Sequence, residues 1–140
     1  MSELYIQRAD WKKEKHMPVI EAPDQVSAGI PFQVKVSIGK EIPHPNTTEH
    51  HIAWFDLYFH PEGEKFPLQV GHFTLTGHGE SVKGPNQGPL YTHPELAVTL
   101  KVNKPGTFHA LSFCNIHGLW ESERAVSVLM TASAPDREAA

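Results

Sequence analysis

The sequence contains very little cysteine, with a single one, Cys114, among 140 residues. One thiol cannot close a disulfide within the chain, and this usage is typical of a reducing compartment. Basic residues are also few, because 12 Lys and Arg stand against 16 Asp and Glu, which gives a formal net charge of −4. Without an overall positive field to hold a polyanion, nucleic acid is excluded as an expected partner.

Long hydrophobic runs are missing as well. No segment approaches the roughly 20 apolar residues that cross a bilayer, so we expect no membrane partner. The first ten residues, MSELYIQRAD, contain no hydrophobic signal core, and we therefore expect a cytoplasmic protein. The length suits one core without disulfides, which predicts a single domain over residues 1–140. Within it we expect an N-terminal arm and loop at 1–20 and a loose tail at 133–140.

Sustained helical periodicity is also absent, and apolar alternation with a period of two recurs in its place. The alternating segments are separated by turn formers, drawn from 12 prolines and 10 glycines. This pattern predicts an all-β fold, an immunoglobulin-like antiparallel β-sandwich of about seven strands with an irregular N-terminal arm. The expected strands span residues 32–39, 51–60, 67–76, 95–102, 106–114 and 124–132.

Histidine, in contrast, is abundant, with ten in the chain. Histidine is the commonest metal ligand in proteins. Three segments, KKEKHMPVI, IPHPNTTEHHI and CNIHGLW, place histidines and the cysteine at strand ends or in loops, where rigid scaffolds usually carry chemistry. Four imidazoles and one thiolate are too rich in nitrogen for a structural zinc site, but imidazole leaves iron, copper, zinc and nickel open. The candidate ligands are His16, His44, His50, His117 and Cys114.

Each segment taken alone also has an ordinary interpretation. CNIH can be a packed thiol near an imidazole, HPNTTEHH a polar loop, and KKEK a solvated charge run. Adjacent residues on an extended segment point to opposite sides, so His51 is expected to be structural or to lie behind a ligand rather than to share an ion with His50. The other histidines have no companion at ligand spacing and are left outside the site: His60, His72, His78, His93 and His109.

Three blocks of the sequence, EKHMPVI, GKEIPHPNTTEHHIAWFDLYF and CNIHGLWES, resemble those of the superoxide reductases. The likeness is to the one-iron, neelaredoxin-type branch of the desulfoferrodoxin family, and it extends over nearly the whole chain. It implies an immunoglobulin-like sandwich with one mononuclear non-haem iron (Fe²⁺/Fe³⁺) and without the N-terminal four-cysteine iron module. The ligands that it implies are His16, His44, His50 and His117 around the iron and Cys114 on its axis, with the sixth position open. His117 is then expected to bind through Nδ1 and the other three through Nε2.

The same resemblance implies an activity, partners and two further residues. The expected reaction is one-electron, inner-sphere reduction of superoxide to hydrogen peroxide at this iron, which an external donor then reduces again. Rubredoxin or a similar small redox protein is the implied donor, and a homotetramer the implied assembly. Lys15 is expected to attract superoxide, and Glu14 to be the sixth ligand in the ferric state, from a mobile loop at 10–16.

Two details of the turn after the cysteine follow from this interpretation. The sulfur of Cys114 is expected to accept N–H bonds from the turn, which tunes its donor strength. Gly118 is expected to relieve backbone crowding there. Trp11 and Trp120 flank the ligand segments, where they either shield the site or belong to the core.

Three other functions remain open from the sequence. A cupredoxin-type blue-copper protein also combines a β-sandwich with an early His and a late Cys–His loop, but no Met follows soon after His117 to supply the weak axial ligand. A metal-free binding sandwich is the second alternative. The third is a dismutase, in which superoxide also serves as the reductant.

Overall fold

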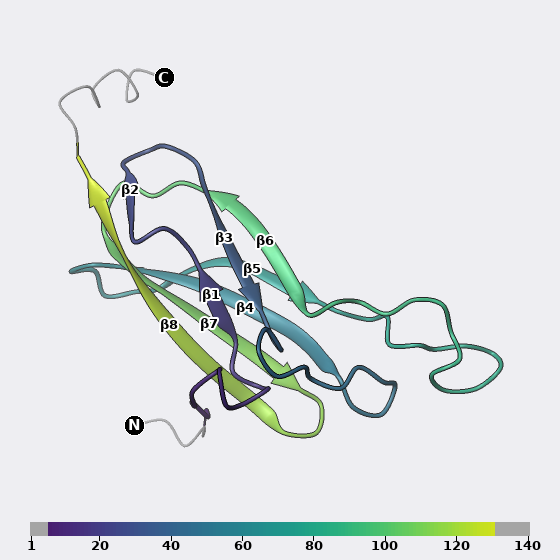
Figure 1. Cartoon of the computed structure of the whole chain (residues 1–140). Helices are drawn as coiled ribbons and strands as arrows, with labels where there is room; N and C mark the ends of the chain where they lie inside the picture. The colour runs from purple at the N-terminus through teal and green to yellow at the C-terminus, as the bar shows by residue number, and fades with distance from the viewer. Residues whose placement is uncertain (1–5, 131–140) are drawn as a thin grey trace.

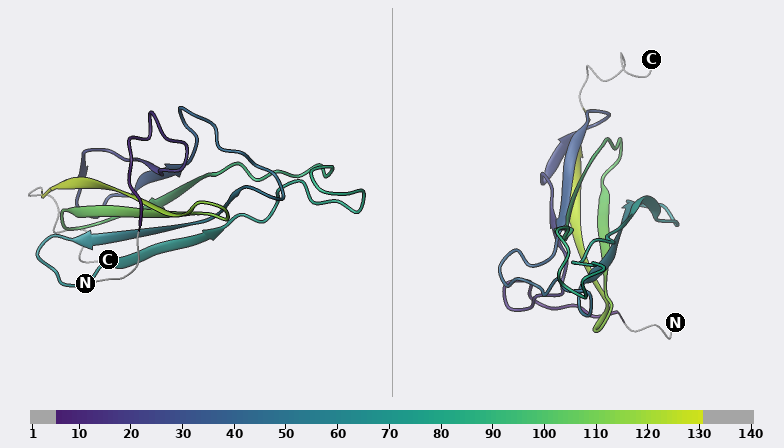
Figure 2. Two further views of the ribbon diagram at one scale, coloured as in Figure 1. Left: turned by 90° about the horizontal axis from the view of Figure 1, so that it is seen from below. Right: turned by 90° about the vertical axis from the view of Figure 1, so that its right-hand side faces the viewer.

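The structure is a computed structural model that describes residues 6–130, and these residues form eight β-strands and no helix. The strands lie in two layers (Figures 1 and 2). The smaller sheet has the order β1 (Val19–Glu21), β3 (Phe32–Ser37), β6 (Glu95–Leu100). The larger sheet has the order β2 (Gln25–Ser27), β8 (Gly118–Leu129), β7 (Gly106–Cys114), β4 (Ile52–Pro61), β5 (Leu68–Thr74). The all-β sandwich is therefore confirmed.

The strand count and pairing differ in detail from the expectation. β1 and β2 are three-residue strands in or beside the segment expected to be irregular, and β2 pairs with β8 in parallel rather than antiparallel fashion. β8 begins at Gly118 rather than at residue 124. The apolar alternation does not predict residues 118–123 as strand, because one of their buried positions is the polar Ser122. The tail at 133–140 lies outside the described residues.

The core forms where the two sheets face each other. Phe55 and Leu57 of β4, Phe108 of β7, and Val34 and Val36 of β3 are completely buried. Burying each such side chain contributes roughly 1.5–3 kcal/mol. The same hydrophobic cluster extends to the last residue of β7, a buried cysteine. The thiol is thus held at one end of the rigid part of the sandwich.

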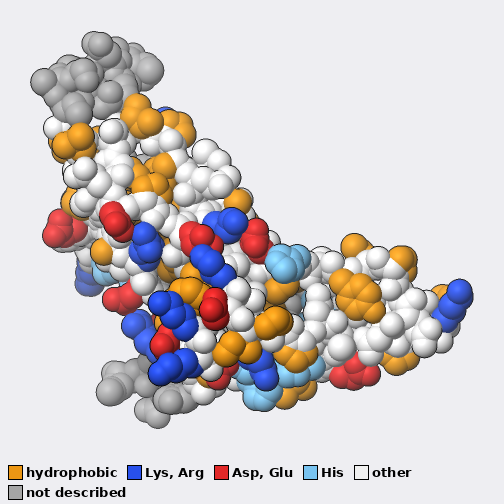
Figure 3. Space-filling model, in the orientation of Figure 1, with side chains coloured by type: hydrophobic (Ala, Val, Ile, Leu, Met, Phe, Trp, Pro, Cys, Tyr) orange, Lys and Arg blue, Asp and Glu red, His pale blue; other side chains and the backbone are white. Residues whose placement is uncertain are grey.

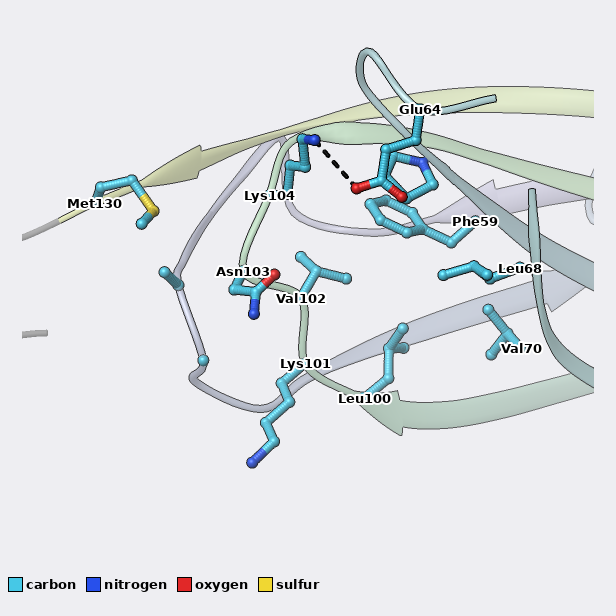
Figure 4. A pocket seen from close by; sticks show the side chains of 13 residues that line it. Phe59, Glu64, Leu68, Val70, Leu100, Lys101, Val102, Asn103, Lys104 and Met130 are labelled. Carbon is cyan, nitrogen blue, oxygen red and sulfur yellow. Dashed lines mark hydrogen bonds and ion pairs between the residues drawn. The ribbon is translucent and has the colours of Figure 1, made fainter. Parts of the chain in front are cut away.

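Two further features stand out. A long connection between β5 and β6, residues 75–94, projects from the body of the sandwich (Figure 1); we call it the β5–β6 loop. At the far end of the strands, a hollow is lined by Phe59, Leu68, Val102 and Met130, beside the ion pair of Lys104 with Glu64 at 3.1 Å (Figure 4). None of the candidate ligands lines that hollow. No helix capable of crossing a membrane occurs in residues 6–130.

Candidate metal centre

The first ligand segment is the turn that joins β7 to β8. Cys114 pairs with Gly118 across the hairpin, which leaves a loop of three residues between them. Gly118 has a φ of +81°, the left-handed conformation that three-residue hairpins use at this position. A Cβ there would meet no atom within 4 Å, so the expected relief of crowding is wrong and the φ angle is what requires glycine. The backbone N–H of His117 donates to Cys114 Sγ over 3.3 Å, the hydrogen bond that we expected.

The second segment brings His16 across this end of the sandwich. The residue is only 5% exposed. The hydroxyl of Ser112 on β7 donates to the carbonyl oxygen of His16 over 3.2 Å. The ring of Trp120 on β8 stacks on the imidazole, with 5.0 Å between ring centroids and 14° between planes. Both large-sheet strands that flank the turn therefore fix His16, and Trp120 covers it from one side.

The third segment is the stretch of residues 43–51, which we call the ligand loop. Proline restricts the residue before it, so Pro45 limits the backbone of His44. The Nδ1 of His44 lies 2.7 Å from the carbonyl oxygen of Pro45, which can only accept. The proton is thus on Nδ1 and the lone pair on Nε2. His50 closes a turn with Thr47, because its N–H donates to Thr47 Oγ1 and its carbonyl accepts from the Thr47 N–H, both over 3.0 Å.

These three segments converge on one point. Possible ligand atoms of His16, His50, Cys114 and His117 all lie within 4.8 Å of one another. His117 Nδ1 is 3.0 Å from His16 Nε2 and 3.7 Å from Cys114 Sγ. The His44 ring joins them, with its centroid 4.8 Å from that of His16 and 4.7 Å from that of His50.

Two nitrogens in this cluster show that it fits a metal ion. The Nε2 atoms of His44 and His50 are buried and have no hydrogen-bond partner among the described residues. Buried polar atoms are nearly always paired, and leaving one unpaired costs on the order of 1–3 kcal/mol. A cation between these rings would satisfy both lone pairs, and the donor set of four imidazoles and one thiol suits iron among other transition metals.

The electrostatics of the cluster favour neutral imidazoles, the form that binds metal. Burial lowers the pKa of His44 to about 4, although its hydrogen bond to Pro45 acts in the opposite direction. Burial also lowers the pKa of His16 and of His50, and the positive charge of Lys15 contributes to lowering the pKa of all three. The positive charge of Lys15 is therefore felt by the rings of His16, His44 and His50.

Glu14 lies on the far side of the His16 ring. Its Oε1 accepts the backbone N–H of His16 over 2.9 Å and lies 2.5 Å from His16 Nδ1. Burial raises the pKa of Glu14, but the hydrogen bonds from His16 outweigh it and hold that pKa below its usual value. The carboxylate thus keeps the proton of His16 on Nδ1 and its lone pair on Nε2. In this conformation Glu14 contacts the Nδ1 side of His16, away from the Nε2 lone pair. The expected role of Glu14 as sixth ligand therefore requires a movement of its loop.

The remaining histidines take no part in the cluster. His51 turns away from His50 and stacks on His78, and His60, His72, His93 and His109 are not among the grouped ligand atoms of the described residues. Two of the residues that support the site, Ser112 and His78, were not predicted from the sequence. Neither stands at ligand spacing, and only the three-dimensional pairing of strands and loops brings them near the ligands.

Known proteins resemble this chain closely. The family model described as Desulfoferrodoxin matches residues 8–123. A neelaredoxin from Megalodesulfovibrio gigas is 59% identical over 122 residues, covering 87% of this chain and 94% of that protein. A superoxide reductase from Pyrococcus furiosus is 58% identical over 118 residues, covering 84% and 93%.

The fold agrees with these matches. The crystal structure of a putative superoxide reductase from Thermotoga maritima superimposes with a TM-score of 0.88 at 52% identity, covering 89% of this chain and 95% of that one. The matches give no support to the alternative of a cupredoxin-type copper protein.

Proposed function

The chain belongs to the desulfoferrodoxin family, and from that premise we infer that it is a superoxide reductase. The reaction adds one electron and two protons to superoxide and yields hydrogen peroxide. The observation that carries this inference is the convergence of His16, His50, His117 and the single cysteine, whose possible ligand atoms lie within 4.8 Å of one another. The Nε2 of His50 is unpaired, as is the Nε2 of the neighbouring His44. The superoxide reductase family uses one non-haem iron, and this cluster fits it.

The residues that hold the iron are His16, His44, His50, Cys114 and His117. The geometry supports Nδ1 as the binding atom of His117 and Nε2 as that of the others, since Nε2 is the nitrogen left with a lone pair on His16 and His44. When bound, the iron supplies the electron by cycling between Fe²⁺ and Fe³⁺. The thiolate of Cys114 donates electron density to it, and the His117 N–H bond to sulfur moderates that donation.

Lys15 attracts the substrate. Its positive charge contributes to the lowered pKa of three histidines in the cluster, so it lies close enough to act on an anion arriving there. Figure 3 shows Lys and Arg side chains, with Asp and Glu side chains among them, at the end of the molecule that carries the N-terminal segment, near exposed histidines. On a chain of net charge −4, local positive charge from Lys15 directs anions to the site rather than to the whole surface.

Glu14 has two roles in this proposal. In the conformation seen here it orients His16 through Nδ1. With the loop at 10–16 rearranged, its carboxylate would be available as the sixth ligand when iron is bound in the ferric state.

We also propose the setting in which the enzyme works. Its electron donor is a small redox protein of the rubredoxin type, and an acidic one suits the basic rim around Trp11, where Lys12 and Lys40 each lie 5.6 Å from the ring centroid. The assembly is a homotetramer. The location is cytoplasmic, in keeping with one buried, unpaired thiol among the described residues.

Iron quantitation with EPR of the oxidised protein tests the metal, and measuring products tests the reaction. Superoxide supplied with an electron donor should give peroxide without matching evolution of oxygen. Oxygen evolved in a one-to-one ratio with peroxide would instead identify a dismutase. Protein purified without any bound transition metal would favour the metal-free sandwich.

A further inference from the structure

The ligand loop is not part of either sheet, so other segments must hold His44 and His50 in place. One support comes from the β7–β8 turn. The side chain of Asn115 accepts the N–H of His51 over 2.8 Å through Oδ1 and donates to the carbonyl of Glu49 over 2.9 Å through Nδ2. This support belongs to the metal centre itself, because Asn115 is next to Cys114.

A second support comes from the β5–β6 loop, through the side chain of Asn86. Its Oδ1 accepts the backbone N–H of Thr48 over 2.8 Å, and its Nδ2 donates to the carboxylate of Glu49 over 2.9 Å. Asn86 has a φ of +63°, a conformation that asparagine tolerates better than most residues. The hydroxyl of Tyr91 donates to its carbonyl over 3.1 Å. The residue is therefore held in an orientation that reaches the ligand loop.

The deepest contact of the β5–β6 loop is His78, which is only 3% exposed. Its ring lies parallel to that of His51, with 3.6 Å between centroids and 7° between planes. Its Nδ1 is 2.7 Å from Asn46 Oδ1 and its Nε2 is 2.8 Å from the carbonyl oxygen of Leu75. Asn46 in turn donates to the carbonyl of Thr92 over 2.8 Å. Asn46 and His51 thus fix the loop two residues after His44 and one residue after His50.

The β5–β6 loop can hold these contacts in place because backbone hydrogen bonds join its two arms. The Gly79 N–H donates to Leu90 O and the Gly88 N–H to Gly79 O, each over 2.9 Å, and the Thr92 N–H donates to Gly77 O over 2.7 Å. A Cβ at Gly88 would come within 2.1 Å of the Glu80 carbonyl oxygen, so the backbone is closely packed there. A loop paired in this way keeps the side chains of His78 and Asn86 in fixed positions against the ligand loop.

We propose that the β5–β6 loop is a brace for the metal centre, with His78 and Asn86 as positioning residues for His44 and His50. This inference rests on the iron site proposed above. Neither residue is among the grouped ligand atoms of the described residues. Both contact the ligand loop at residues that are not ligands, which are Asn46, Thr48, Glu49 and His51. Groups that orient metal ligands from behind typically change metal affinity by 10–100-fold when they are replaced, and we expect an effect in that range here.

The test compares Asn86→Gly and His78→Leu with the wild-type chain by cobalt(II) titration and by EPR of the iron-loaded ferric protein. Glycine keeps the φ of residue 86 and removes only the contacts of its side chain. Val82→Ser is the matched control, because Val82 lies in the same loop with its side chain fully exposed. Cobalt(II) binding reports the site without any dependence on superoxide turnover.

We expect both positioning variants to bind cobalt at least tenfold more weakly and to show altered ferric EPR signals, while Val82→Ser matches wild type. Wild-type affinity and an unchanged signal in Asn86→Gly would overturn the brace while leaving the proposed function intact. Absence of metal binding by the wild-type chain would overturn both. Should His78→Leu fail to fold, Asn86→Gly decides the matter alone, because it removes only exposed contacts.

Discussion

The metal-free protein should lose stability in mild acid because of His44. Burial lowers the pKa of this side chain from 6.5 to about 4 in the folded state. The unfolded chain therefore binds more protons than the folded chain between these two values, and the free energy of unfolding falls as the pH is lowered through that window. Above pH 6.5 both states carry neutral His44, and the effect vanishes.

The size of the loss follows from the gap between the two pKa values. Below pH 4 it reaches about 3 kcal/mol, and at pH 5 about 2 kcal/mol is already lost. Burial also lowers the pKa of His16 and His50, so their contributions have the same sign. A loss of this size is a large share of the roughly 5–15 kcal/mol by which domains are stable.

Urea unfolding of chelator-treated protein at pH 7, 6 and 5 measures this loss, and His44→Gln isolates it because glutamine does not titrate. We expect the variant to lose about 2 kcal/mol less than wild type between pH 7 and pH 5, with unchanged m-values. Parallel pH profiles for the two proteins would show that the His44 ring is not buried as described, and the reasoning on the cluster would fail with it.

Three further substitutions test the assigned roles. Cys114→Ser should abolish the sulfur-to-Fe³⁺ charge-transfer band in the visible spectrum, and persistence of that band would remove Cys114 from the ligands. Lys15→Ala should slow the encounter with superoxide about tenfold at low ionic strength and flatten its salt dependence in pulse radiolysis; an unchanged rate would refute steering. Glu14→Ala should spare that encounter but alter the ferric spectrum near neutral pH, and a wild-type spectrum would count against ligation.

The sandwich could be predicted from the sequence because strands such as β4 and β7 alternate between buried and half-buried positions over most of their length. β1 and β2 could not, since three residues are too short to show a period. The early start of β8 was hidden by Ser122, a polar residue on the buried face. Polar residues at inward positions erase the signal on which such predictions depend.

The candidate ligands could be predicted from the sequence because they lie in short blocks of neighbouring residues. The groups that orient His16 and His44 are local, a carboxylate two residues before one and a carbonyl one residue after the other. A short block such as EKH or HP therefore encodes both the ligand and its hydrogen-bond partner. His78 acts from a distant loop through ring stacking, which leaves no spacing rule in the chain.

Supports close in sequence and supports from distant segments have different effects on the site. Supports that are local in sequence fix which nitrogen of a ring carries the lone pair, because one hydrogen bond settles the tautomer. Supports from distant segments fix where the ring stands, because only the packed fold can place Trp120 over His16 or His78 against His51. The ligand loop depends most on the second kind, since it belongs to neither sheet. Its two histidines should therefore be the ligands most sensitive to substitutions far from the metal.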